Sequence, residues 1–200
     1  SRWRDLVFPK PFFRKGVVAL FHSFSNELAH KVFPTPRRQG RLLYSALRFS
    51  HIPFRIVTEG RTGDLADLRI VFLGGVSVIS RAAFEKLIEF VRAGGVLCLY
   101  DSPLEFEEFG RPLKTEKIFG IRWGEEEREE VLIPDLSGGI SGFGFRRISV
   151  ERGKVLLRDK AGHGRICLVR LGKGRVYAIS FSSSTYSLLE VVRFVLRREG

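Results

Sequence analysis

The chain has 200 residues, a formal net charge of +12 at pH 7, 44% hydrophobic residues and 28% charged residues. These values are ordinary for one globular domain. No apolar run approaches the roughly 20 residues of a membrane-spanning helix, so we expect no membrane partner. Cys98 and Cys167 each lie in an apolar run, which argues against a disulfide framework and favours a reducing, cytoplasmic compartment. No residue spacing indicates a metal or a cofactor.

The basic charge has two explanations that the composition leaves open. Arg makes up 25 of the 34 basic residues, Met is absent, and Asn26 and Gln39 are the only side-chain amides. This composition is typical of a hyperthermophile protein with an Arg-rich surface. A strong positive charge also fits a nucleic-acid or other polyanion partner. The candidate polyanion contacts are Arg37, Arg38, Arg41, Arg197 and Arg198.

The first hundred residues alternate buried strands with helices. Apolar runs predict strands over residues 16–22, 53–58, 69–75 and 95–101, and apolar spacings of three and four predict a helix over residues 37–52. Residues 59–68 are predicted to be a loop. The strand runs are apolar without alternation, as in parallel strands that are covered on both faces.

The clearest predicted element is the helix that follows Ser80. Its hydroxyl is a suitable N-cap acceptor, and Gly94 suits the positive φ that ends many helices. Between them, one helical face carries Phe84, Leu87, Ile88 and Val91.

The second half is less regular until residue 153. Residues 102–152 hold acidic runs and many Gly, and we expect an irregular insertion or lid that is mostly loop, with one hairpin. Strands follow at 155–158, 164–171 and 174–181, and a helix at 185–199. The sequence thus predicts one domain over residues 1–200. Its fold class is an α/β three-layer sandwich with a mostly parallel, flavodoxin-like central sheet and a C-terminal antiparallel hairpin.

Several segments in order resemble the class I glutamine amidotransferase-like superfamily, and most of all the β-galactosidase trimerisation domain of family 42 glycoside hydrolases. They read VVALFHSFS, GRLLYSALRFSHIPFRIV, DLADLRIVFLGGVSVIS, FEKLIEFVRAGGVLCLYD and ICLVRLGKGRVYAIS. The likeness weakens over residues 102–152. It implies a non-catalytic member of the superfamily, with a partner chain recognised at the second of these segments.

A catalytic cysteine is not indicated by the sequence. Catalytic members carry a cysteine in G-x-C-x-G after such a strand, followed by a late His and an acid. Here that turn would fall near Tyr100 or Asp101, bulky residues flank Cys98, and His163 has no acid two positions on. Cys98 is therefore predicted to be a buried structural thiol, and no catalytic residue is assigned.

Small and polar residues follow three of the predicted strands. In open α/β sheets, ligands bind at the carboxyl ends of the strands. A ligand pocket there would be formed by Ser23, Ser25, Gly74, Gly75, Ser77, Asp101 and Ser102. Gly, Ser and Asp also serve in turns and caps, so a purely structural role is the alternative.

Three functions remain. The first is a non-catalytic module for oligomerisation or for partner or ligand binding, linked to carbohydrate-active enzymes. The second is a basic, polyanion-binding protein of a thermophile. The third, hydrolase or transferase action at the strand-end pocket, lacks an evident general base.

Overall fold

The computed structural model describes residues 18–29, 38–133, 140–181 and 185–199. A nine-stranded sheet forms its centre, with the strand order β2-β1-β3-β5-β11-β10-β8-β7 and with β9 paired to β10. The first five strands of this order are parallel to one another. They are β1 (Val18–His22), β2 (Phe54–Thr58), β3 (Ile70–Gly74), β5 (Val96–Tyr100) and β11 (Gly174–Ile179). The predicted α/β class with a mostly parallel sheet is therefore confirmed.

The other half of the sheet is antiparallel. β11 pairs with β10 (Gly164–Leu171) across the predicted Gly-Lys-Gly turn, and β10 pairs with both β8 and β9 (Gly153–Arg158). A long hairpin of β7 (Ile121–Ile133) and β8 (Ile140–Val150) completes the sheet.

The segment 102–152 is more regular than the sequence predicts. Besides β7 and β8 it holds β6 (Phe106–Glu107), which pairs with β4 (Val78–Ile79), and the helix α5 (Thr115–Phe119). The Gly residues and acidic runs that suggested a loop lie largely within β7 and β8, because cross-strand pairing outweighs their low strand propensity. A lid role for this segment stays a prediction.

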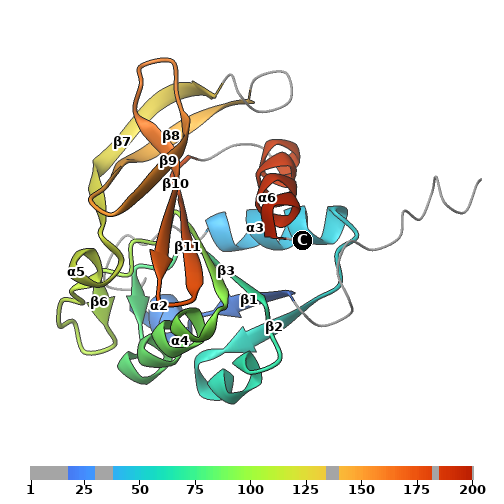
Figure 1. Cartoon of the computed structure of the whole chain (residues 1–200), viewed down its shortest axis with the longest axis vertical. Helices are drawn as coiled ribbons and strands as arrows, with labels where there is room; N and C mark the ends of the chain where they lie inside the picture. The colour runs from blue at the N-terminus through green and yellow to red at the C-terminus, as the bar shows by residue number, and fades with distance from the viewer. Residues whose placement is uncertain (1–17, 30–37, 134–139, 182–184, 200) are drawn as a thin grey trace, which may run out of the picture.

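Helices lie on both faces of the parallel strands (Figure 1). On one face α3 (Arg38–Phe49) and α6 (Thr185–Glu199) share a buried apolar cluster with β1, β3, β5 and β11. On the other face α4 (Arg81–Ala93) covers β3 and β5. The short helix α2 (Phe24–Ala29) follows β1, and the 3-10 helix η1 (Glu59–Leu65) occupies part of the predicted loop after β2. No helix in the described residues is both long and apolar enough to cross a membrane.

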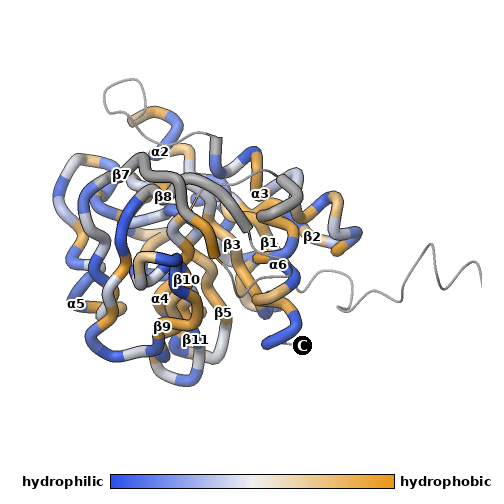
Figure 2. Tube along the Cα trace, turned by 90° about the horizontal axis from the view of Figure 1, so that it is seen from above, coloured by the Kyte–Doolittle hydropathy of each residue, from blue (hydrophilic) through white to orange (hydrophobic). Residues whose placement is uncertain are grey.

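The distribution of hydropathy follows these layers. Figure 2 shows the hydrophobic residues concentrated in the central strands and the hydrophilic ones toward the outside. The two buried clusters lie on opposite sides of the sheet because successive strand residues point to opposite faces. Cys98 and Tyr100 belong to the α3–α6 side, whereas Leu97 and Leu99 belong to the α4 side.

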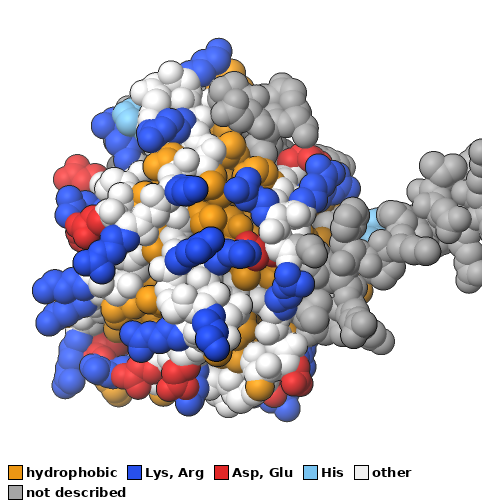
Figure 3. Space-filling view, viewed as in Figure 1, with side chains coloured by type: hydrophobic (Ala, Val, Ile, Leu, Met, Phe, Trp, Pro, Cys, Tyr) orange, Lys and Arg blue, Asp and Glu red, His pale blue; other side chains and the backbone are white. Residues whose placement is uncertain are grey.

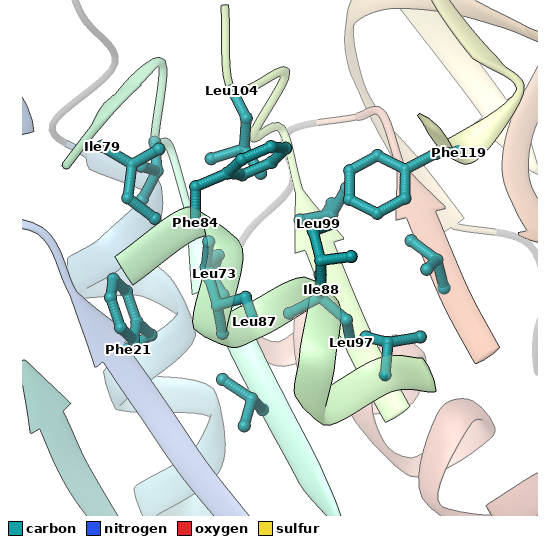
Figure 4. Close-up of a cluster of buried hydrophobic side chains, with 14 of the residues drawn as sticks. Phe21, Leu73, Ile79, Phe84, Leu87, Ile88, Leu97, Leu99, Leu104 and Phe119 are labelled. Atoms are coloured by element: carbon teal, nitrogen blue, oxygen red, sulfur yellow. The ribbon is translucent and has the colours of Figure 1, made fainter. Parts of the chain in front are cut away.

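The helix α4 forms as its sequence predicts. The Ser80 hydroxyl accepts a hydrogen bond from the backbone N–H of Ala83, and Gly94 ends the helix at a φ of 123°. Leu87 and Ile88 then pack onto Leu73 and Leu97 of the sheet, with Phe84 facing Phe119 in an edge-to-face contact (Figure 4).

The Gly-Lys-Gly turn tolerates no side chain at its second Gly. A Cβ on Gly174 would lie 2.0 Å from the carbonyl oxygen of Val91 and 2.2 Å from that of Gly95. Backbone atoms cannot yield as a flexible side chain can. Gly174→Ala is therefore expected to lower the free energy of unfolding by about 3 kcal/mol. Urea denaturation would measure the change, with Gly63→Ala as the control, since nothing lies within 4 Å of a Cβ there.

Candidate functional site

The carboxyl ends of β1, β3 and β5 meet at one edge of the sheet, where the sequence predicts a ligand pocket. The Gly75 N–H donates to the carbonyl of Tyr100 at 2.9 Å. The Val76 N–H donates to the Ser102 hydroxyl at 3.0 Å. The same hydroxyl donates to the carbonyl of Tyr100. The turn after β3 is thus fixed to the end of β5.

A carboxylate that the sequence analysis did not single out joins the loops from β1 and β2. Glu59, the first residue of η1, accepts from the hydroxyls of Ser23 and Ser25 at 2.8 and 2.9 Å. Its oxygens also accept the backbone N–H groups of Ser25 and Ser80 at 3.1 and 2.8 Å. Four donors therefore surround Glu59, and they hold α2, η1 and the start of α4 together.

Asn26 occupies the centre of this edge. Its side-chain oxygen accepts the N–H groups of Ser77 and Val78 at 2.9 and 3.1 Å, and its amide donates to the carbonyl of Gly75 at 3.0 Å. The backbone N–H of Asn26 donates in turn to the Ser23 hydroxyl. One buried amide thus satisfies three backbone groups of the chain after β3.

The second amide of the sequence lies at the same edge. Gln39, in the first turn of α3, donates to the carboxylate of Asp101 at 3.1 Å. Asp101 has a φ of 47°, in the left-handed region that is uncommon for residues other than Gly. Gly74 allows α3 to approach this closely, because a Cβ on it would lie 3.0 Å from the carbonyl oxygen of Gln39.

The predicted pocket residues are therefore brought together, but mostly as a buried network. Ser23, Gly75, Ser77, Asp101 and Ser102 are buried, and Ser25 and Gly74 are half-buried. We name this set with Asn26, Gln39 and Glu59 the strand-end network. Only Ser25 of the network borders an open cavity of about 450 Å³, whose other walls include Leu28, Phe106 and Phe109. Ligand binding by these residues stays a prediction.

Both cysteines are unsuited to nucleophilic chemistry. Cys98 is fully buried, as predicted, and burial, with Glu199 nearby, raises the pKa of its thiol well above the usual value. Burial likewise raises the pKa of Cys167 to about 11. His163 lies against Asp159 in the turn between β9 and β10 rather than at the strand ends. Among the described residues, no cluster of three His, Cys, Asp or Glu could hold a metal ion.

In the part of the chain that the structure describes, Phe24 and Phe49 are exposed, and two groups of other exposed apolar side chains form candidate interaction surfaces. The first, which we call the edge surface, is formed by Tyr44, Phe54 and Ile56. Phe54 and Ile56 point to the same side of β2. The ring of Tyr44 packs edge-to-face on that of Phe54, with 5.6 Å between the ring centroids. Among the described residues, β2 is the end strand of the sheet and pairs only with β1. Ile56 is 56% exposed there.

The second apolar place, which we call the loop surface, is formed by Leu28, Phe106 and Phe109 around the 450 Å³ cavity. Phe109 is 82% exposed and Leu28 is 66% exposed. Exposed apolar groups of this size mark interaction surfaces more often than scattered single residues do.

The predicted polyanion contacts that the structure describes lie at the ends of two helices. Arg41 is exposed in the first turn of α3, and Arg197 and Arg198 are exposed in the last turn of α6. Arg38 is the first residue of α3, and Arg37 lies outside the described residues. Polyanion binding by this set stays a prediction.

No protein-family model and no curated protein sequence matches the chain. Several solved structures, however, have a similar fold. A catalytic mutant of a GH42 β-galactosidase from G. stearothermophilus aligns over 92% of this chain with a TM-score of 0.78 and 17% identity. The β-galactosidase from Bacillus circulans sp. alkalophilus aligns over 92% with a TM-score of 0.78 and 19% identity. That from the Antarctic haloarchaeon Halorubrum lacusprofundi aligns over 97% with a TM-score of 0.75 and 12% identity.

The chain spans only about 30% of the length of these enzymes. At identities below 20% the likeness is one of fold, and the wider amidotransferase-like assignment stays a prediction. The resemblance to a domain of family 42 β-galactosidases that the sequence predicts is confirmed as a likeness of fold: the chain folds like one part of those enzymes.

Proposed function

We propose that the protein is a non-catalytic interaction module that self-associates through the edge surface and belongs to the machinery of carbohydrate-active enzymes. The observation that carries the proposal is the coverage of the fold. Nearly the whole chain corresponds to less than a third of a β-galactosidase. A part of that size, without a nucleophile in the expected place, is better suited to holding chains together than to catalysis.

The edge surface is the part of the molecule that best fits this role. It combines a strand edge on which no described strand lies with exposed apolar side chains from α3 and β2, in the segment where the resemblance implies partner recognition. Pairing of β2 with a second copy would satisfy its outer backbone groups. It would also bury Tyr44 and Ile56, each of which contributes about 1.5–3 kcal/mol when fully buried.

Charged substitutions test the edge surface. Tyr44→Asp with Ile56→Asp is expected to weaken self-association at least 100-fold, because an unpaired carboxylate buried in an interface costs about 3 kcal/mol or more. Sedimentation velocity over a dilution series would measure the dissociation constant. Both side chains are exposed in the isolated chain, so the variant should fold normally by circular dichroism.

The loop surface provides the matched control. Leu28→Asp with Phe109→Asp also places two carboxylates at exposed apolar positions, but it should leave the mass of the assembly unchanged. Dissociation by the loop-surface variant alone would place the interface there and contradict the edge-surface proposal. If neither variant changes the assembly, self-association does not use either surface and the proposal is wrong.

A further inference from the structure

A basic cavity lies between the strands β9, β10 and β11 and the end of α6. Its volume is about 640 Å³, within the range of small-molecule sites. Figure 3 shows Lys and Arg side chains gathered on this face of the molecule. Five cations and one carboxylate line the cavity: Arg152, Lys154, Arg170, Arg175, Arg198 and Glu199.

Strand register explains why the cations converge. Lys154, Leu168 and Tyr177 are direct partners across the three strands. Two residues further along β10, on the same face of the sheet, Arg170 lies directly opposite Arg175. Like charges that face each other across a ladder destabilise a sheet, so the fold keeps a local repulsion that a bound anion would relieve.

The described residues neutralise only part of this positive charge. Glu199 is buried, and its two carboxylate oxygens accept from the hydroxyl of Tyr177 and from the guanidinium of Arg175. Burial and the hydrogen bond to Glu199 raise the pKa of Tyr177, so its hydroxyl stays protonated and stays a donor. The one carboxylate at the cavity therefore neutralises Arg175.

Three of the remaining four cations are open to a ligand, while Arg198 lies over the ring of Phe194. Arg152, Lys154 and Arg170 are exposed and form no ion pair with any residue that the structure describes. Guanidinium groups bind oxyanions through paired N–H donors, and Leu156, Leu168 and Tyr177 supply an apolar wall beside them. We propose that this cavity binds a small organic phosphate, with Arg152, Lys154 and Arg170 holding the phosphate group.

Inorganic pyrophosphate is the probe for the charged part of the site. Isothermal titration calorimetry with the full chain should detect its binding, and Arg152→Gln with Arg170→Gln should weaken it at least about tenfold through the loss of charge-assisted hydrogen bonds. Lys154→Gln is a second, independent variant that should weaken binding in the same direction. All three side chains are exposed, so unfolding is not expected.

The matched control removes the same charge elsewhere. Arg61→Gln with Lys117→Gln takes away two exposed cations outside the cavity and should leave the affinity for pyrophosphate unchanged. Equal weakening by both double variants would show diffuse attraction to a basic surface and overturn the proposal. So would tighter binding of single-stranded or duplex nucleic acid that is lost in the cavity variant. A lack of pyrophosphate binding by the unaltered chain would also overturn the proposal.

Discussion

Asp159→Asn is expected to lower the free energy of unfolding by about 3–5 kcal/mol at neutral pH, because it leaves a buried guanidinium without its counterion. Arg165 is fully buried and donates to the carboxylate of Asp159 at 2.8 Å and to the carbonyl of Arg146 at 3.1 Å. The pair therefore joins the turn after β9 to β10 and β8. Urea denaturation at pH 7 would measure the loss.

The effect of Asp159→Asn should also depend on pH. Burial tends to raise the pKa of Asp159, but hydrogen bonds from Arg165 and from the His163 N–H outweigh burial and lower it. A lowered pKa in the folded state stabilises the protein above the unfolded value of about 3.9. That contribution is lost as the pH falls through the folded pKa. The gap between variant and parent should thus shrink in acid.

A solvent-exposed ion pair provides the comparison. Asp67 is 87% exposed and lies 4.0 Å from Arg55, so Asp67→Asn should change stability by less than about 1 kcal/mol. An equally small effect of Asp159→Asn at pH 7 would mean that water or another group compensates Arg165, and the structural role given to this pair would be wrong.

Asn26→Ala should be similarly damaging, with an expected loss of about 3–5 kcal/mol in the free energy of unfolding. The substitution leaves the N–H groups of Ser77 and Val78 and the carbonyl of Gly75 without the side chain that satisfies them, and each unsatisfied buried group costs about 1–3 kcal/mol. Thermal and urea denaturation would both report the change.

The neighbouring position Leu28 offers a control on the same short helix. Because Leu28 is largely exposed, Leu28→Ala should have an effect within about 0.5 kcal/mol. If Asn26→Ala were equally mild, the turn after β3 would be held by its other contacts. The strand-end network would then be a candidate for ligand binding rather than for structure.

Elements specified by adjacent residues are the ones that the sequence predicts well. The helix α4 has its cap, its apolar face and its terminating Gly within fifteen residues, and the structure has it at Arg81–Ala93. The short helix α2 and the paired strands β4 and β6 were not predicted, because two- to six-residue elements have too little periodicity to detect. The β7–β8 hairpin depends on pairing between residues whose individual propensities are poor.

In the strand-end network, too, the sequence predicts what adjacent residues specify and misses what depends on distant contacts. The sequence places Ser23, Asp101 and Ser102 at strand ends, and parallel topology then brings them to one edge. It does not reveal Glu59, whose partner Ser23 is 36 residues away. The signal for Asn26 and Gln39 was nevertheless present: they are the chain's only side-chain amides, and both are buried at this edge.

The mass of the protein in solution tests the central claim most directly. Size-exclusion chromatography with light scattering, at 0.1 M and at 1 M salt, separates apolar from ionic association, because the screening length falls from about 10 Å to about 3 Å. We expect a mass of at least twice the 22.8 kDa of one chain, unchanged between the two salt concentrations. A mass of one chain at both would contradict an interaction module that self-associates. An assembly that dissociates only at 1 M salt would contradict the apolar edge surface as its basis.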